Sequence, residues 1–315
     1  MKTMAWGLAL LLASTGFAKD GINESEVLEA DKRTKKHYFV KKVVDDVKIS
    51  GNNKSLAGRK QFIAPSFRVN YLIDGKYRND VGGITSSKRT VHSTLSGVEN
   101  DQFQAITEAM YDEFVARLKE AGFDVGDHTT NSGFSNFKMK KSYPHEKSGK
   151  VVTLPDGLIA QQGFSHPAMK LIMADREAAV LVVDLTVDFV IHNRNKKKFT
   201  FGNKAAVETS QGISVTGQMS INDSKSGVTV ALGQPVTSPN AFGKVADATK
   251  GTDKASDVIY GVGQWIGGGG LGNRKKTTRA SVVADPDLYA EAAKDALGSV
   301  SATFVDALNK VTASE

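Results

Sequence analysis

Four consecutive glycines at residues 267–270, within the sequence GQWIGGGGLGN, could cradle a phosphate group with their backbone amides. A phosphate loop needs the pattern G-x-x-x-x-G-K-[ST], but Asn273 and Arg274 stand where its lysine and hydroxyl residue belong. The dinucleotide pattern G-x-G-x-x-G, counted from Gly261 and Gly263, has Ile266 in place of its third glycine, and the preceding residues look helical where the pattern needs a strand. We therefore interpret the run as a flexible link or a helix stop, and we expect no nucleotide or other cofactor.

Ser135 and Lys138, in the sequence SNFK, have the spacing of the nucleophile and base of the penicillin-recognising serine hydrolases. The companion motifs of that chemistry would be SIN at 220–222 and KSG at 225–227. These two motifs fall in one predicted hairpin turn and cannot line opposite walls of a site. SNFK itself lies in a stretch rich in glycine and serine. An acyl-hydrolase that uses Ser135 and Lys138 is therefore the alternative hypothesis rather than the first.

Metal-binding patterns are weak in this sequence. The six histidines are scattered, without an H-E-x-x-H motif, and there is no cysteine. Asp184, Asp188 and His192 fall on one face of a predicted strand, where a metal or an acid–base pair is conceivable. The favoured interpretation is a polar edge where the strand leaves the core, and we expect no metal.

A basic run follows the glycines and consists of Arg274, Lys275, Lys276 and Arg279. It could contact an anionic surface, although such runs are more often a solvated face. The whole chain carries 41 lysines and arginines against 34 aspartates and glutamates, and its net charge is +7. This balance favours anionic partners in general, and a nucleic-acid partner is not expected.

The first residues have the pattern of a secretory signal peptide. Lys2 precedes a short apolar stretch at 4–13, and Gly16 and Ala18 occupy the small positions of a cleavage site. We expect cleavage after Ala18 and a periplasmic or secreted protein. The alternative is an uncleaved anchor. The absence of cysteine excludes disulfides and a lipid-modified N-terminal cysteine.

Two helices are the clearest elements that could position these residues. Apolar residues at helical spacing predict a helix over 101–121, which Asn100 or Asp101 can cap. A second helix is predicted over 286–311, with Asp285 as its cap. Shorter helices are expected over 167–178 and 253–266.

The strongest strand is predicted over 178–192, and its apolar first half suggests a central place in the sheet. Further strands are expected over 61–74 and 123–127, with one short strand at 37–44 inside a polar leader at 19–60. An antiparallel hairpin is predicted over 205–232. Membrane-spanning strands show the same alternation of apolar and polar residues, but they usually carry aromatic residues at their ends. The hairpin has no aromatic residue, so a half-buried sheet is favoured.

The remaining stretches at 74–100, 127–165 and 233–284 read as long loop insertions. Together the elements predict a single α/β domain over 61–315, with a mixed sheet and helices mainly on one face. The expected order is strand, helix, strand and helix, then three antiparallel strands and a C-terminal helix.

Two stretches carry a family resemblance. The first is the end of a predicted helix with the following turn and strand, marked by Leu118, Gly122, Phe123 and Val125. The second is the apolar strand at 178–184, with the sequence AAVLVVD. This arrangement resembles the envelope superfamily that contains the curli secretion channel (CsgG-like) and the N-terminal domain of TolB. The resemblance covers roughly residues 61–232 and the final helix, and it rests on packing patterns without catalytic residues.

The resemblance implies a periplasmic scaffold or binding domain that works with envelope proteins. We therefore expect an exported, non-catalytic cell-envelope protein whose partners are envelope or secretion-assembly proteins, or an anionic envelope surface. Self-association into a homo-oligomer stays open.

Overall fold

A computed structural model describes most of the chain from Thr34 to Ala313. The described residues are 34–37, 40–43, 47–81, 87–127, 142–160, 178–193, 198–199, 202–203, 208–223, 225, 227–247, 258–259 and 274–313. Residues 1–18, for which a signal peptide is expected, lie outside them, as do Ser135, Lys138, the glycine run at 267–270 and nearly all of the short helix expected over 167–178.

A main sheet of nine strands forms the centre of the described part of the chain, in the order β3-β14-β13-β10-β4-β9-β8, with β7 pairing β4 and β15 pairing β13. β10 is parallel to β4 and antiparallel to β13, so the sheet is mixed. The strands are β3 (Val47–Gly51), β4 (Gln61–Leu72), β7 (Asp124–Gly126), β8 (His145–Glu146), β9 (Lys150–Thr153), β10 (Ala179–Asn193), β13 (Glu208–Asn222), β14 (Gly227–Leu232) and β15 (Val236–Ser238).

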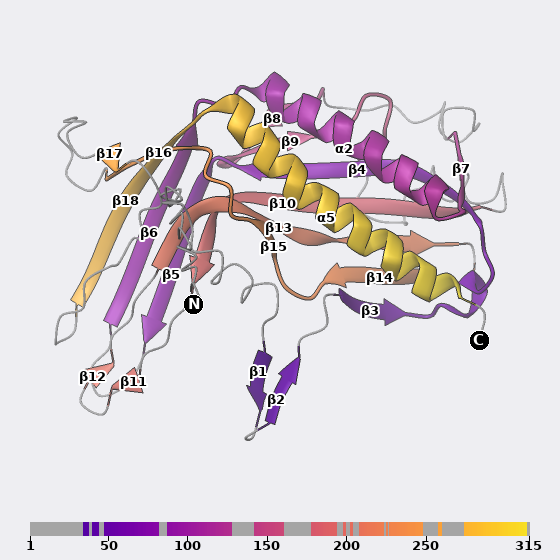
Figure 1. The fold of residues 1–315 in the computed structure, drawn as a ribbon, viewed down its shortest axis with the longest axis horizontal. Coiled ribbons are helices and arrows are strands. Elements are labelled where there is room, and N and C mark those ends of the chain that lie inside the picture. The colour runs from indigo at the N-terminus through magenta and orange to yellow at the C-terminus, as the bar shows by residue number, and fades with distance from the viewer. Residues whose placement is uncertain are drawn as a thin grey trace, which may run out of the picture.

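A second sheet of five strands lies at one end of the main sheet (Figure 1). Its order within the described residues is β17-β16-β18-β6-β5. The strands are β5 (Asp74–Val81), β6 (Ser87–Ser96), β16 (Gly243–Asp247), β17 (Val258–Ile259) and β18 (Arg274–Ala284). Two short pairs complete the strands: β1 (Thr34–His37) with β2 (Val40–Val43), and β11 (Lys198–Phe199) with β12 (Gly202–Asn203).

Two long helices, α2 (Asn100–Glu120) and α5 (Pro286–Thr312), cross one face of the main sheet (Figure 1). Phe114 of α2 and Phe304 of α5 are buried in the same core cluster as Val183 and Leu185 of β10. Burial of one apolar stripe per helix against the sheet is the main source of helix stability in a domain of this kind. Both helices therefore lie on one face of the mixed sheet, as expected, with α2 next to β4 and β9 and α5 next to β13 and β15 (Figure 1).

The helix ends follow local sequence signals. The Asp285 side chain accepts hydrogen bonds from the backbone amides of Asp287 and Leu288, at 3.0 and 3.2 Å, and so caps α5 as predicted. The expected cap of α2 at Asn100 or Asp101 is wrong by one position. Glu99 is the cap residue, and its amide donates to the Gln102 side chain at 2.9 Å.

Further expectations are corrected. The loop expected over 74–100 is largely the β5–β6 hairpin, the insertion over 127–165 contributes β8 and β9 to the main sheet, and the insertion over 233–284 contributes β15 to β18. The helix expected over 253–266 is wrong at Val258–Ile259, which pair with β16. Within the polar leader, β3 pairs with β14, and Leu56 of the short 3-10 helix η1 (Lys54–Leu56) is fully buried.

No helix in the described residues is long and apolar enough to cross a membrane.

Candidate functional site: a basic face on the second sheet

Pairing of β5, β6 and β18 brings basic residues from three parts of the sequence together. β18 runs parallel to β6, with Lys275 opposite Lys88 and Arg279 opposite His92. β5 runs antiparallel to β6, with Lys76 opposite His92. Residues directly opposite in a sheet lie on the same face, so Arg279, His92 and Lys76 form one row across three strands.

Burial distinguishes the two faces of this sheet. Val91, Leu95, Ala280 and Val282 are buried, and they occupy alternate positions that pack toward the rest of the protein. The intervening positions face outward, and Arg279 is exposed among them. We call this outward side of β5, β6, β16 and β18 the basic face. The residues of this face whose side chains the structure describes include Asp74, Lys76, Arg78, Thr90, His92, Thr94, Lys244, Arg279 and Val283.

The charge of the basic face is strongly one-sided. Among its described side chains, four are lysine or arginine and one is aspartate, an excess of three positive charges. The side chains of Lys76, Arg78, Lys244 and Arg279 are all exposed. The arrangement can attract phosphate or carboxylate groups spread over a surface.

The predicted basic run divides between the two faces. Lys275 and Arg279 occupy positions of the basic face. Arg274 and Lys276 occupy the alternate positions of β18, opposite Ser87 and Arg89. The basic run is therefore part of strand β18, and the register places only Lys275 and Arg279 at positions of the basic face.

A hydrogen-bonded pair joins this sheet to the main sheet. The Tyr77 hydroxyl of β5 lies 2.8 and 2.9 Å from the two carboxylate oxygens of Asp188 in β10. Asp188 also accepts a bond from the Val190 amide at 3.1 Å. Burial raises the pKa of Tyr77 far above its ordinary value, and the nearby Asp188 carboxylate adds to this effect. The phenol therefore keeps its proton and acts as the donor.

A second polar cluster lies on the face of the main sheet opposite the helices. Arg68 holds Asp184 through two hydrogen bonds, and the buried Asn70 donates to Asp184 at 3.1 Å and to the Leu185 carbonyl at 2.8 Å. The Lys150 ammonium donates to the Asn70 side-chain oxygen at 3.0 Å. Each polar group therefore has a partner, which is the pattern of a structural network.

The metal or acid–base hypothesis for Asp184 and Asp188 finds no support in this geometry. Arg68 binds one carboxylate and Tyr77 the other, so the two carboxylates belong to separate hydrogen-bonded groups. Across the part of the chain that the structure describes, no group of three or more histidines, aspartates or glutamates could hold a metal ion.

The companion motifs of the hydrolase hypothesis lie in one hairpin, as predicted. Ser220 and Asn222 belong to β13, and β14 begins at Gly227. The Asp223 side chain accepts a bond from the Lys225 amide at 2.8 Å and shapes the turn.

No protein-family model, no curated protein and no solved structure matches this chain. The sequence analysis did not identify Lys76, Arg78 or Lys244 as members of the basic face. The sequence signal for strand β6, which joins them to β18, was the alternation of Thr90, His92 and Thr94 with Val91, Ser93 and Leu95, a pattern typical of a half-buried strand.

Proposed function

We propose that the chain is an exported, non-catalytic cell-envelope binding protein that docks onto an anionic partner through its basic face. The observation that carries the proposal is the register of β5, β6 and β18, which gathers Lys76, Arg279 and their neighbours on one outward face.

Electrostatic cost supports a binding role for this face. Like charges directly opposite in a sheet destabilise it, by up to about 1 kcal/mol per pair. Lys76 and Arg279 flank His92 in one row, and both side chains are exposed together with those of Arg78 and Lys244. A concentration of cations on one face attracts anionic partners, which would relieve the repulsion between these charges.

The envelope assignment rests on the signal-like residues at 1–18 and on the resemblance to the curli secretion channel and TolB superfamily. The chain that accumulates in cells should then begin at Lys19. Mass spectrometry of that chain tests this part of the proposal, and a cytoplasmic chain that begins at Met1 would contradict it.

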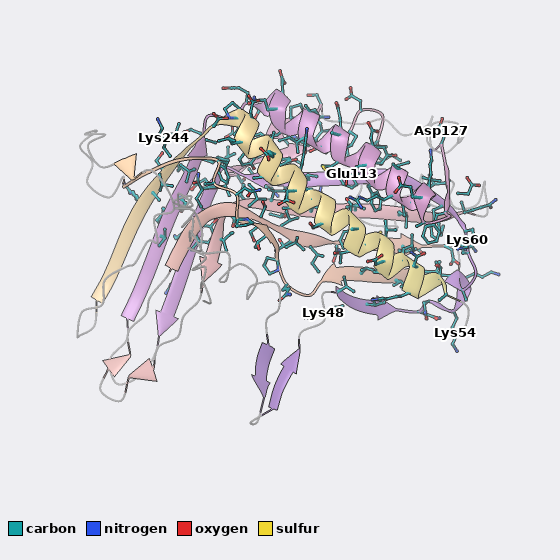
Figure 2. The ribbon with its side chains drawn as sticks, viewed as in Figure 1. Lys48, Lys54, Lys60, Glu113, Asp127 and Lys244 are labelled. Carbon is teal, nitrogen blue, oxygen red and sulfur yellow. The ribbon has the colours of Figure 1, made fainter. Side chains whose placement is uncertain are left out.

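Binding to isolated envelope membranes tests the docking surface. We expect the purified chain to sediment with these membranes, and the Lys76→Glu, Arg279→Glu double variant to lose most of this binding. The matched control is Lys48→Glu, Lys54→Glu, which removes the same charge from exposed residues. Lys54 lies at the far end of the molecule from Lys244 (Figure 2). If both double variants bind equally well, the basic face is not the docking surface.

A further inference from the structure

We infer that the anionic partner is the phosphate-bearing surface of a lipid bilayer, rather than an acidic protein. This inference rests on the proposed function and names the occupant of the same face. Its basis is the two-dimensional arrangement of the charges, the hydroxyl residues between them, and an exposed aliphatic residue at one edge.

The charges form an array rather than a line. Neighbouring strands lie about 4.8 Å apart, and every second residue along a strand is about 7 Å further on. Lys244 of β16, Arg279 of β18 and Lys76 of β5 therefore spread cations over the width of four strands. An acidic peptide added to a sheet binds along one edge, whereas a bilayer offers phosphates over an area.

Threonines stand between the cations. Thr90 lies opposite Arg78 in one row of the basic face, next to the row of Arg279, His92 and Lys76, and the exposed Thr94 follows on β6. A hydroxyl can donate a hydrogen bond to a phosphate oxygen, so these threonines can contribute neutral donors beside the charged ones.

One edge of the basic face carries an exposed aliphatic side chain. Val283 is 51% exposed and lies directly opposite Lys244. Leu288 is also exposed in the first turn of α5, but Asp285 and Asp287 belong to the same region, so we assign the apolar contact to Val283. Cations beside an exposed aliphatic group are the usual composition of surfaces that lie on anionic membranes.

The aspartates of the face limit its extent. Asp74 and Asp80 are both on β5, the edge strand of the sheet. The strongest attraction is therefore expected over β6 and β18, with Lys76 and Arg78 at the margin.

The test measures binding of the purified protein to lipid vesicles. The protein used is the full chain as it accumulates in cells. The probe is phosphatidylglycerol mixed into phosphatidylcholine vesicles, compared with phosphatidylcholine alone. We expect binding only to the mixed vesicles. Since each cation near an anionic membrane changes affinity about fivefold, Lys76→Gln, Arg279→Gln should weaken binding about 25-fold, and the control Lys48→Gln, Lys54→Gln much less. Val283→Ser should weaken it further without changing the net charge.

The outcomes separate this inference from the proposed function. Binding to envelope membranes that depends on the basic face, without binding to protein-free mixed vesicles, would overturn the lipid inference and leave the proposed function standing with a protein partner. Equal vesicle binding by the wild type and the Lys76→Gln, Arg279→Gln variant would overturn the inference. Absence of binding to both preparations would overturn the inference and the proposed function together.

Discussion

Arg68 and Asp184 face each other on the parallel strands β4 and β10 and form a two-bond ion pair, with Nε–Oδ1 and Nη2–Oδ2 distances of 3.0 and 2.6 Å. The Arg68 side chain is only 15% exposed, so its guanidinium depends on this partner. Removal of one member of such a pair leaves the other with an uncompensated charge in a poorly hydrated place.

Asp184→Ala should therefore lower the free energy of unfolding by about 2–3 kcal/mol, since Arg68 and Asn70 both lose an acceptor. The double variant Arg68→Met, Asp184→Leu should recover most of this loss, because apolar residues of similar volume need no partner. Urea unfolding of the three proteins measures both values. A loss below about 0.5 kcal/mol in Asp184→Ala would mean that the pair does not contribute to stability.

Phe114→Ala and Phe304→Ala should each cost about 3–5 kcal/mol, because both side chains are almost completely buried beneath the two helices. The Phe114 ring also lies 5.7 Å from the Phe67 ring, centroid to centroid. Melting temperature is the measurement, and charge reversal at the exposed Lys48 or Lys54 is the surface control that should leave it nearly unchanged. A Phe304→Ala variant that melts like the wild type would show that α5 is not part of the core.

Gly217→Ala should destabilise the main sheet by about 1–3 kcal/mol. Gly217 has a φ of +151°, and an added Cβ would lie 2.3 Å from the Asp184 carbonyl oxygen. Gly227→Ala is the matched control in the same hairpin, since its Cβ would meet no atom closer than 3.6 Å. Chemical denaturation should separate the two variants, and equal losses would contradict the close approach of β13 to β10.

Stability should fall steeply above about pH 10, because several tyrosines must stay neutral in the folded state. Burial raises the pKa of Tyr71 and of Tyr289 well above the ordinary value. For Tyr111, burial is the main cause and the nearby carboxylates of Asp112 and Asp127 add to it, and together they raise the pKa to about 12. The tyrosines of the unfolded chain lose their protons at about pH 10. Each buried tyrosine therefore makes its full contribution to the free energy of unfolding below that pH, and the contribution is lost as the pH rises toward the pKa of the folded state.

Each such tyrosine should lower the free energy of unfolding by about 1.4 kcal/mol per pH unit in that window. Urea unfolding at about pH 9 and about pH 11 measures the change, while the ultraviolet absorbance of tyrosinate follows ionisation. Tyrosinate signal from all seven tyrosines in a chain that is still folded at the higher pH would contradict the burial of these rings.

Much of the core could be predicted from the sequence because its elements have clean periodicity. The stripe of Phe103, Ile106, Met110 and Phe114 defines α2, and the apolar first half of β10 defines a central strand. The β5–β6 hairpin escaped prediction because Ser93 separates Val91 from Leu95 at the inward positions of β6, and Gly75 occupies an inward position of β5. With these small residues among the inward positions, the two-residue alternation carries little hydrophobic contrast.

The candidate site was predictable only in part for a similar reason. The basic run at 274–279 is visible in the sequence, but its pairing with β6 depends on strand order, which composition does not specify. Lys76 lies about two hundred residues away from Arg279 and joins it only through the register of β6. Asp184 and Asp188 looked like a set in the sequence, although their partners, Arg68 and Tyr77, come from different strands.

The salt dependence of binding to envelope membranes tests the central claim most directly. From about 0.01 M to about 0.15 M salt, the screening length falls from about 30 to about 8 Å, so attraction through an excess of three charges should weaken strongly. We predict at least a tenfold loss of affinity for the wild-type chain over this range, and a weaker and flatter response for Lys76→Glu, Arg279→Glu. A wild-type affinity that does not change with salt, or a slope that is the same in the variant, would contradict the account.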